Sequence, residues 1–243
     1  MHTAVLTGED FHYLAHVRRL GPGDTIPAST PDGSRFAMTV RERGRDRLSV
    51  TLRPIGDGAA PPALPMTVAQ AVVKPAAMDL IVRQATELGV RRIVPVLTER
   101  SMPASHAHPR LPRWQRIGRS ASQQSGRGPL PAIEAPRSLA DVLQATPGTA
   151  GKLVFQPPPR GDADIDLPDA LDPAHPVWLL LGPEGGFAGP ELDHIAGAGF
   201  RRCALGATVL RAETAVVAAV MAVRLLWHRA APQPQPDLGE AMR

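Results

Sequence analysis

The chain has 243 residues, a net charge of +4 and a single cysteine, Cys203. This length allows one large domain or two modest ones, each with its own core, and we expect two. One cysteine excludes an internal disulfide and any multi-cysteine metal site, which fits a reducing compartment. No segment has the roughly 20 unbroken apolar residues of a membrane span, and the N-terminus lacks a signal-peptide pattern, so we expect a soluble cytoplasmic protein.

The first 53 residues have the pattern of a small all-β domain. Apolar residues alternate with other residues over 36–40 and again over 48–52, and a Pro-Asp-Gly turn lies at 31–33. Such alternation is typical of half-buried strands, and a small barrel would close them. Residues 54–65 are rich in proline and glycine. This composition indicates a linker between two domains.

Strands and helices alternate from residue 66 onward, which is typical of a parallel α/β sheet. We expect strands at 66–73, 92–97, 130–134, 152–156, 177–181 and 200–205. We expect helices over about 78–88, 111–126, 190–197 and 212–227. The last helix is apolar almost all round, so it needs cover on more than one side. A second subunit or burial within its own domain would provide this cover, and we favour the subunit.

Positive charge is concentrated between Arg91 and Arg127. This segment holds eight arginines and one acidic residue, Glu99. Guanidinium groups match phosphate oxygens, so the segment suits contact with a nucleic acid. A solvated helix face would explain the same residues, and the charge pattern alone does not separate the two interpretations.

Two segments near the C-terminus carry the strongest functional signal. Residues 179–192 read Leu-Leu-Leu-Gly-Pro-Glu-Gly-Gly-Phe-Ala-Gly-Pro-Glu-Leu, and residues 205–215 read Leu-Gly-Ala-Thr-Val-Leu-Arg-Ala-Glu-Thr-Ala. Each has the pattern of a buried strand, a glycine-bearing loop and a helix, an arrangement that binds ligands in α/β proteins. Glycine lets the backbone approach a flat base closely. Neither segment has the spacing of a dinucleotide fingerprint or a phosphate loop, so a cofactor would be held in another way.

The polar residues of these loops indicate acid–base chemistry. Glu184 and Glu213 can accept a proton in a partly dry pocket, and Arg211 can stabilise negative charge that develops on a carbonyl. Thr214 adds a hydroxyl group. The structural alternative is a turn glutamate and a helix-capping cluster. Because both loops occur together, we favour a functional site.

Together the two loops resemble the RsmE family of 16S ribosomal RNA uridine N3-methyltransferases, which belongs to the SPOUT superfamily. The resemblance extends to Lys74 with residues 85–90, to Glu99-Arg-Ser101, to Trp114-Gln-Arg-Ile117 followed by Gln124-Ser-Gly-Arg127, and to residues 13–24. It therefore covers nearly the whole chain.

The resemblance implies an α/β SPOUT methyltransferase domain with a C-terminal trefoil knot, preceded by a small all-β PUA-like barrel. The expected bounds are 1–58 for the RNA-binding barrel, 66–230 for the knotted domain and 231–243 for a flexible tail. Knots are so rare that topology rules alone favour an ordinary doubly wound sheet. The implied cofactor is S-adenosylmethionine, and the implied partner is 16S rRNA of the small ribosomal subunit. A homodimer through the knotted domain is also implied, with no metal and no membrane.

The family's site residues are carried over by motif. The S-adenosylmethionine site would comprise Leu181, Gly182, Pro183, Glu184, Gly185, Leu205, Gly206, Val209, Leu210 and Thr214. Arg211 would stabilise the uracil oxyanion, and Glu213 would take the proton from N3. RNA would contact Arg18, Arg19, Arg100, Arg113, Arg116 and Arg127.

The chain departs from the family's pattern at three places. Thr208 stands where relatives usually carry arginine, and Ala15 and His16 stand where glycine and arginine are common. The usual opening strand before Leu6 is largely absent. This last departure predicts either a misplaced start or a barrel that lacks a strand.

Other functions fit parts of the sequence. A SPOUT domain that has lost catalysis would act in RNA binding or assembly, and a related methyltransferase would modify tRNA or a ribose 2′-hydroxyl. A ribose target would make a base-directed acid such as Glu213 less useful. His106 and His108 have a spacing that suits a metal, but no third ligand lies near them in the sequence, so we expect a solvated loop.

Overall fold

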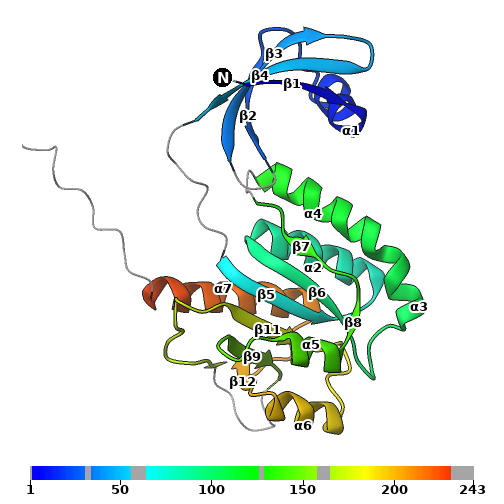
Figure 1. The fold of residues 1–243 in the computed structure, drawn as a ribbon. Coiled ribbons are helices and arrows are strands. Elements are labelled where there is room, and N and C mark those ends of the chain that lie inside the picture. The colour runs from blue at the N-terminus through cyan, green and yellow to red at the C-terminus, as the bar shows by residue number, and fades with distance from the viewer. Residues whose placement is uncertain (1, 31–33, 56–63, 126–128, 158–164, 231–243) are drawn as a thin grey trace, which may run out of the picture. The chain divides into compact units, whose positions relative to one another are not determined.

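The structure is a computed structural model that describes residues 2–30, 34–55, 64–125, 129–157 and 165–230 (Figure 1). Its contacts divide the chain into two compact units, one of residues 1–63 and 122–130 and the other of residues 64–121 and 131–243. Most of the linker predicted at 54–65, the turn at 31–33 and the tail at 231–243 lie outside the described residues. Within the described ranges, no helix combines the length and the apolar character needed to span a bilayer.

In the smaller unit, four antiparallel strands form one sheet in the order β1-β4-β3-β2. The elements are β1 (His2–Thr7), α1 (Gly8–His12), the π-helical turn η1 (Tyr13–Val17), β2 (Thr25–Ser29), β3 (Arg35–Arg43) and β4 (Arg47–Pro54). Met38 and Val40 of β3 and Leu48 and Val50 of β4 are buried in one apolar core. The alternation predicted for these two strands is therefore confirmed.

Two expectations for this unit are wrong. The unit is not all-β, because residues 8–17 form α1 and η1. Phe11 and Ala15 lie four residues apart on one helical face and are both buried in the core, so packing on the sheet stabilises a helix too short to show its periodicity. An opening strand is also present, because the six residues of β1 pair with β4 from His2 opposite Leu52 onward.

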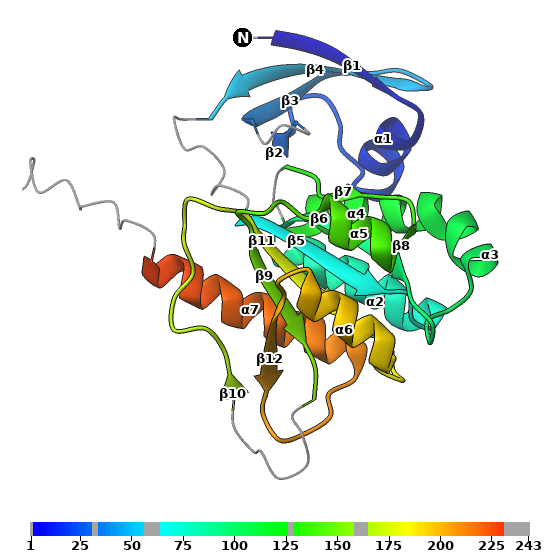
Figure 2. The same ribbon diagram turned by 60° about the horizontal axis from the view of Figure 1, so that its bottom comes forward.

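The larger unit is a mainly parallel sheet with helices on both faces (Figures 1 and 2). Its strands are β5 (Leu64–Ala71), β6 (Val90–Leu97), β7 (Ala132–Ile133), β8 (Arg137–Ser138), β9 (Gly151–Phe155), β10 (Ile165–Asp166), β11 (Val177–Leu181) and β12 (Arg201–Leu205). Its helices are α2 (Pro75–Glu87), α3 (Ala104–Ala107), the 3-10 turn η2 (His108–Arg110), α4 (Leu111–Ser125), α5 (Leu139–Ala145), α6 (Gly189–Gly197) and α7 (Ala212–Ala230). The strand order is β10-β12-β9-β11-β5-β6-β7, and β8 also pairs with β6.

Two apolar cores lie on the two faces of this sheet. The first contains Met78 of α2, Trp114 of α4 and Val220 of α7. The second contains Val142 of α5 and Ile195 of α6. Each of these helices therefore buries apolar side chains against the strands.

Three local predictions for the larger unit need correction. The strand expected at 130–134 is only the two-residue β7, since Pro131 directly before it lacks the N–H group that would extend the ladder. Helix α5 was not expected, and the Ser138 side chain caps its start by accepting a hydrogen bond from the Asp141 N–H at 3.1 Å. Between the strands expected at 152–156 and 177–181, the structure has a further short strand, β10, which pairs with β12 in the antiparallel sense.

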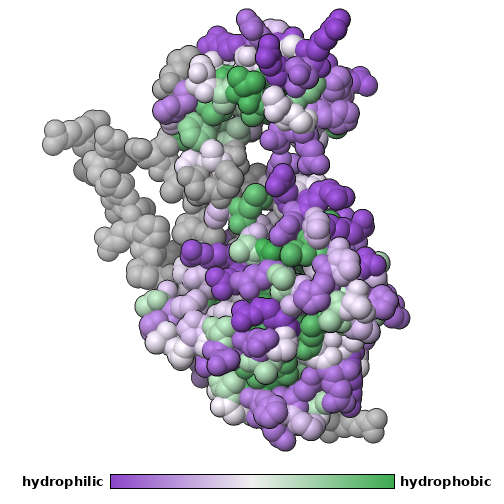
Figure 3. All heavy atoms as spheres, turned by 45° about the vertical axis from the view of Figure 1, so that its right-hand side comes forward, coloured by the Kyte–Doolittle hydropathy of each residue, from purple (hydrophilic) through white to green (hydrophobic). Residues whose placement is uncertain are grey.

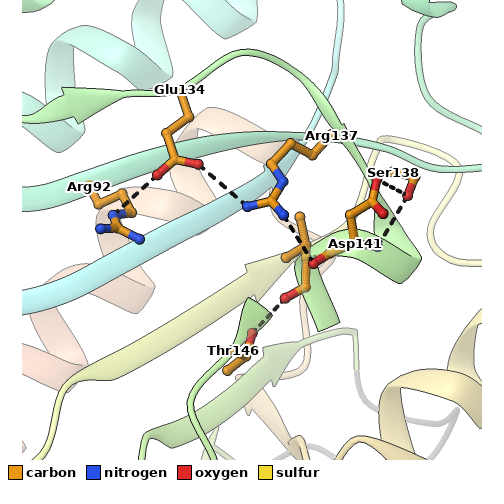
Figure 4. A network of polar contacts seen from close by, with 7 residues as sticks. Arg92, Glu134, Arg137, Ser138, Asp141 and Thr146 are labelled. Carbon is orange, nitrogen blue, oxygen red and sulfur yellow. Dashed lines mark hydrogen bonds and ion pairs between the residues drawn. The ribbon is translucent and has the colours of Figure 1, made fainter. Parts of the chain in front are cut away.

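A network of polar contacts attaches the short strands β7 and β8 to the sheet (Figure 4). Glu134 forms ion pairs with Arg92 of β6 at 3.3 Å and with Arg137 of β8 at 3.7 Å. Arg137 also donates to the backbone carbonyl of Asp141 at 3.4 Å. One arginine of the basic segment, Arg92, is thus an internal ion-pair partner.

Gly118 lets α4 approach β7 closely, and we expect a larger residue there to destabilise the fold. A Cβ atom at Gly118 would lie 2.7 Å from Cδ1 of Ile133. Gly118→Leu should therefore lower the free energy of unfolding by about 2 kcal/mol, as overpacked cores do. The matched control is Gly197→Ala in α6, where a Cβ meets nothing within 4 Å. Urea titration measures both, and equal stability of the Gly118 variant and the wild type would contradict the packing argument.

Candidate active site

The sheet order places three loops at one edge of the larger unit. Strands β12, β9 and β11 are adjacent and parallel, so the loops that follow Phe155, Leu181 and Leu205 emerge at the same carboxyl edge. Such an edge is the usual ligand-binding position of an α/β sheet. The two glycine-bearing loops predicted from the sequence therefore lie together, with a third loop between them.

A cavity made of two adjoining parts lies at this edge, and we name it the inner cavity. Its larger part has a volume of about 200 Å³. That part is lined by Phe155, Gln156, Pro157, Leu181, Gly182, Pro183, Glu184, Gly186, Phe187, Leu192, Val209, Leu210, Ala212 and Ala215. A smaller extension of about 60 Å³ adds Leu205, Gly206 and Thr208. Apolar side chains and glycine backbone thus form most of the wall.

A wider cavity of about 650 Å³, which we name the outer cavity, adjoins the inner one. The two cavities have Glu184, Val209, Leu210 and Ala212 in common. The other lining residues are Lys74, Ala76, Ala77, Leu80, Arg211 and Glu213. Two cations and two carboxylates therefore stand beside a mainly apolar cavity.

The geometry favours glycine at two positions of the loop after β11. Gly186 has φ +69°, a conformation that favours glycine. A Cβ at Gly182 would lie 3.1 Å from the ring of Phe187, which itself lines the inner cavity. A larger residue at either position would therefore strain the loop that lines the inner cavity.

Helix α7 begins beside both cavities. The Ala215 N–H donates to the carbonyl of Arg211 at 2.8 Å, so Arg211 is the N-cap residue directly before the first helical residue, Ala212. The positive end of the helix dipole faces the outer cavity there, and it favours bound negative charge. Arg211 is exposed and Glu213 is partly buried.

Most of the predicted cofactor residues line the inner cavity. Leu181, Gly182, Pro183, Glu184, Val209 and Leu210 line its larger part, and Leu205 and Gly206 line the extension. Gly185 and Thr214 are not among the lining residues, and Thr214 is exposed on α7. The sequence reasoning missed Phe155, Gln156, Pro157, Phe187, Leu192, Ala212 and Ala215.

The predicted RNA-contact arginines have different surroundings. Arg18, Arg19 and Arg116 are exposed. Figure 3 turns the side of Figure 1 that carries α4 toward the viewer, and hydrophilic side chains cover much of that face of the larger unit. Arg127 lies outside the described residues. The exposed arginines are available for phosphate contact.

Two of the predicted RNA contacts already have partners in the protein. Arg113 donates to Asp79 of α2 through Nε at 2.8 Å and Nη2 at 2.7 Å. The hydrogen bond and the charge of Asp79 raise the pKa of the Arg113 guanidinium. Arg100 donates to the carbonyl of Gly185 at 2.9 Å.

The cysteine and the two histidines singled out in the sequence show no sign of a nucleophile or a metal site. Burial raises the pKa of the Cys203 thiol to about 11, so the thiol stays protonated near neutral pH and is a poor nucleophile. His106 and His108 are exposed. In the part of the chain that the structure describes, no group of three or more His, Cys, Asp or Glu residues could hold a metal ion.

Comparison with known proteins identifies both units. An RNA methyltransferase domain family matches residues 60–224, and an RNA methyltransferase PUA domain family matches residues 6–53. A ribosomal RNA small subunit methyltransferase E from Synechocystis is 31% identical over 92% of this chain and 73% of its own length, and one from Mycobacterium tuberculosis is 30% identical over 93% and 87%. The crystal structure of a ribosomal RNA small subunit methyltransferase E from Neisseria gonorrhoeae bound to S-adenosyl methionine has a TM-score of 0.84 at 29% identity, covering 93% of this chain and 92% of that one.

These similarities confirm the fold class, a PUA-like domain followed by a SPOUT α/β domain. The trefoil knot stays a prediction, since strand order alone does not establish threading. The family model matches well over half of the chain, and the relatives match almost all of it. The chain belongs to the ribosomal RNA small subunit methyltransferase E family of RNA methyltransferases.

Proposed function

We propose that this chain transfers the methyl group of S-adenosylmethionine to N3 of a uridine in the 16S rRNA of the small ribosomal subunit. The observation that carries the proposal is the meeting of the two glycine-bearing loops at adjoining cavities, with Arg211 and Glu213 in the wall of the outer one. The names of the relatives support the choice of RNA, and the ligand of the gonococcal relative supports the choice of cofactor.

The residues of the inner cavity fit an adenosine-containing cofactor. Leu181, Phe187 and Leu192 offer apolar surface to a flat ring, and the loop 182–186 offers backbone groups with few side chains in the way. When bound, S-adenosylmethionine would supply an electrophilic methyl group on a sulfonium sulfur. The same apolar side chains would exclude water from that methyl group.

The outer cavity is the proposed site of the target base. Uracil N3 carries a proton and has no free lone pair in the ring plane, so the base must lose this proton before N3 can attack a methyl group. We assign proton acceptance to Glu213 and stabilisation of the uracil oxyanion to Arg211. The helix dipole at the start of α7 favours the same anion. Alignment of N3 with the methyl group supplies much of the remaining rate enhancement.

The wider assembly is also a proposal. We assign RNA phosphate contacts to Arg18, Arg19 and Arg116, with Arg127 added on the strength of the family resemblance. The proposed organisation is an RNA-binding domain over 1–58, a knotted domain over 66–230 and a tail over 231–243. We further propose a cytoplasmic homodimer that joins through the knotted domain.

Labelling with S-adenosylmethionine tests the proposed function directly. The full chain is incubated with assembled small subunits, naked rRNA and tRNA, and the modified position is mapped by reverse transcription. A methyl group on N3 blocks Watson–Crick pairing, so we expect an arrest at one uridine of the small-subunit RNA. Labelling of tRNA alone, or methylation of a ribose oxygen, would refute the proposal. Calorimetry with S-adenosylmethionine separates an active methyltransferase from a catalytically inactive module, because the inactive module should show no binding.

A further inference from the structure

We propose that Arg100 is a positioning residue for the loop over residues 182–188, which we name the cofactor loop. Arg100 was expected to contact RNA, but its guanidinium donates from Nη1 to the carbonyl of Gly185 at 2.9 Å. The inference rests on the proposed function, in which this loop holds S-adenosylmethionine. It assigns Arg100 the role of fixing the loop before the ligand arrives.

Three of the hydrogen bonds that hold the cofactor loop are made by residues spaced three apart. Gln70 of β5 donates from Nε2 to the carbonyl of Gly182 at 3.2 Å, and Gln70 is fully buried. Arg100 holds the carbonyl of Gly185. The Ala188 N–H donates to Oε2 of Glu191 at 2.9 Å. The loop is therefore attached to β5, to the turn after β6 and to the first turn of α6.

Arg100 stands on a turn that has hydrogen bonds of its own. The Thr98 N–H donates to the Ser101 hydroxyl at 2.9 Å, and this hydroxyl donates to the Thr98 carbonyl at 2.9 Å. The Glu99 N–H donates to Oε1 of Glu191 at 2.8 Å. Glu191 thus joins the turn to the cofactor loop with both of its carboxylate oxygens. A guanidinium mounted on this turn can hold Gly185 in one place.

The side-chain stem of Arg100 also packs over Gly185. A Cβ added at Gly185 would lie 3.4 Å from Cδ and 3.6 Å from Cβ of Arg100. Gly185 does not line either cavity, so its contribution to the site is through the loop's shape. Arg100 and Gly185 therefore act as a pair in which the loop backbone lies directly against the arginine.

The affinity for S-adenosylmethionine without RNA separates positioning from RNA contact. Arg100→Met removes the donor and keeps an apolar stem, whereas Arg100→Lys keeps one charged donor. Arg91→Met is the matched control, because Arg91 is an exposed arginine of the same strand region. We expect the Met variant of Arg100 to bind about tenfold more weakly, the Lys variant to recover most of this loss, and the Arg91 variant to bind as the wild type does.

Amide hydrogen exchange of the ligand-free protein tests, without the cofactor, whether Arg100 holds the cofactor loop in place. In the Arg100→Met variant we expect the amides of Gly186 and Ala188 to exchange faster, with no change in the amides of β5 and β11. Unchanged exchange and unchanged cofactor affinity, with weaker RNA binding, would overturn the inference and return Arg100 to RNA contact. If the wild type binds no S-adenosylmethionine, the proposed function fails, and the exchange measurement alone decides whether Arg100 holds the loop.

Discussion

Arg211→Ala is expected to lower the rate constant of methyl transfer by about 10³-fold while leaving the affinity for S-adenosylmethionine close to that of the wild type. Removal of one preorganised charged donor at a developing anion typically costs 10²–10³ in rate. Arg211 lines the outer cavity but is not among the residues of the inner one, so its loss should spare the cofactor. Single-turnover kinetics measures the rate, and calorimetry measures the affinity.

The pH dependence gives this prediction a second readout. A nearby cation lowers the pKa of the uracil N3–H, so the variant's deficit should shrink as the pH rises and the base ionises without help. Arg229→Ala, an exposed arginine on the same helix, is the matched control and should retain full activity. A variant of Arg211 that turns over at the wild-type rate would remove this residue from the mechanism.

Sequence patterns predicted those helices and strands in which buried apolar residues recur at regular spacing. In α2, Met78, Ile81, Val82 and Ala85 recur at helical spacing and are all buried, so the helix was predictable. Helix α5 has only seven residues, which is too few for a periodic signal, and its start depends on the Ser138 cap. The short helix with Phe11 in the smaller unit was missed for the same reason. Tertiary packing decided these segments.

The candidate site was predictable only in part, because the residues of a strand do not reveal which other strands lie beside it in the sheet. The glycine loops were found from their own residues. Phe155 and Pro157 were missed, since only the sheet order reveals that β9 lies between β11 and β12. The partners of Arg100 and Arg113 are likewise remote in sequence, at Gly185 and Asp79. Charge patterning identified these arginines but not what they bind.

Met221→Glu combined with Leu225→Glu is expected to convert the proposed homodimer into a folded monomer. Val217, Met221 and Leu225 follow each other at four-residue spacing on α7, and the last two are 36% and 57% exposed. Val216, Val220 and Val223 on the other side of the helix are buried in the core. An apolar stripe of this kind is stabilised when a second copy covers it.

The size of the effect follows from the burial that the dimer would provide. Each fully covered side chain contributes about 1.5–3 kcal/mol, so two buried charges in their place should weaken dimerisation by more than about 100-fold. Light scattering measures the mass, and circular dichroism verifies that the variant is folded. Arg119→Glu makes the same change of charge at an exposed arginine of another helix, α4, and should leave the dimer intact. The stripe lies on α7, and the first turn of this helix borders both cavities. Loss of the dimer should therefore also lower the affinity for S-adenosylmethionine. A wild-type protein that is monomeric and active would exclude this assembly.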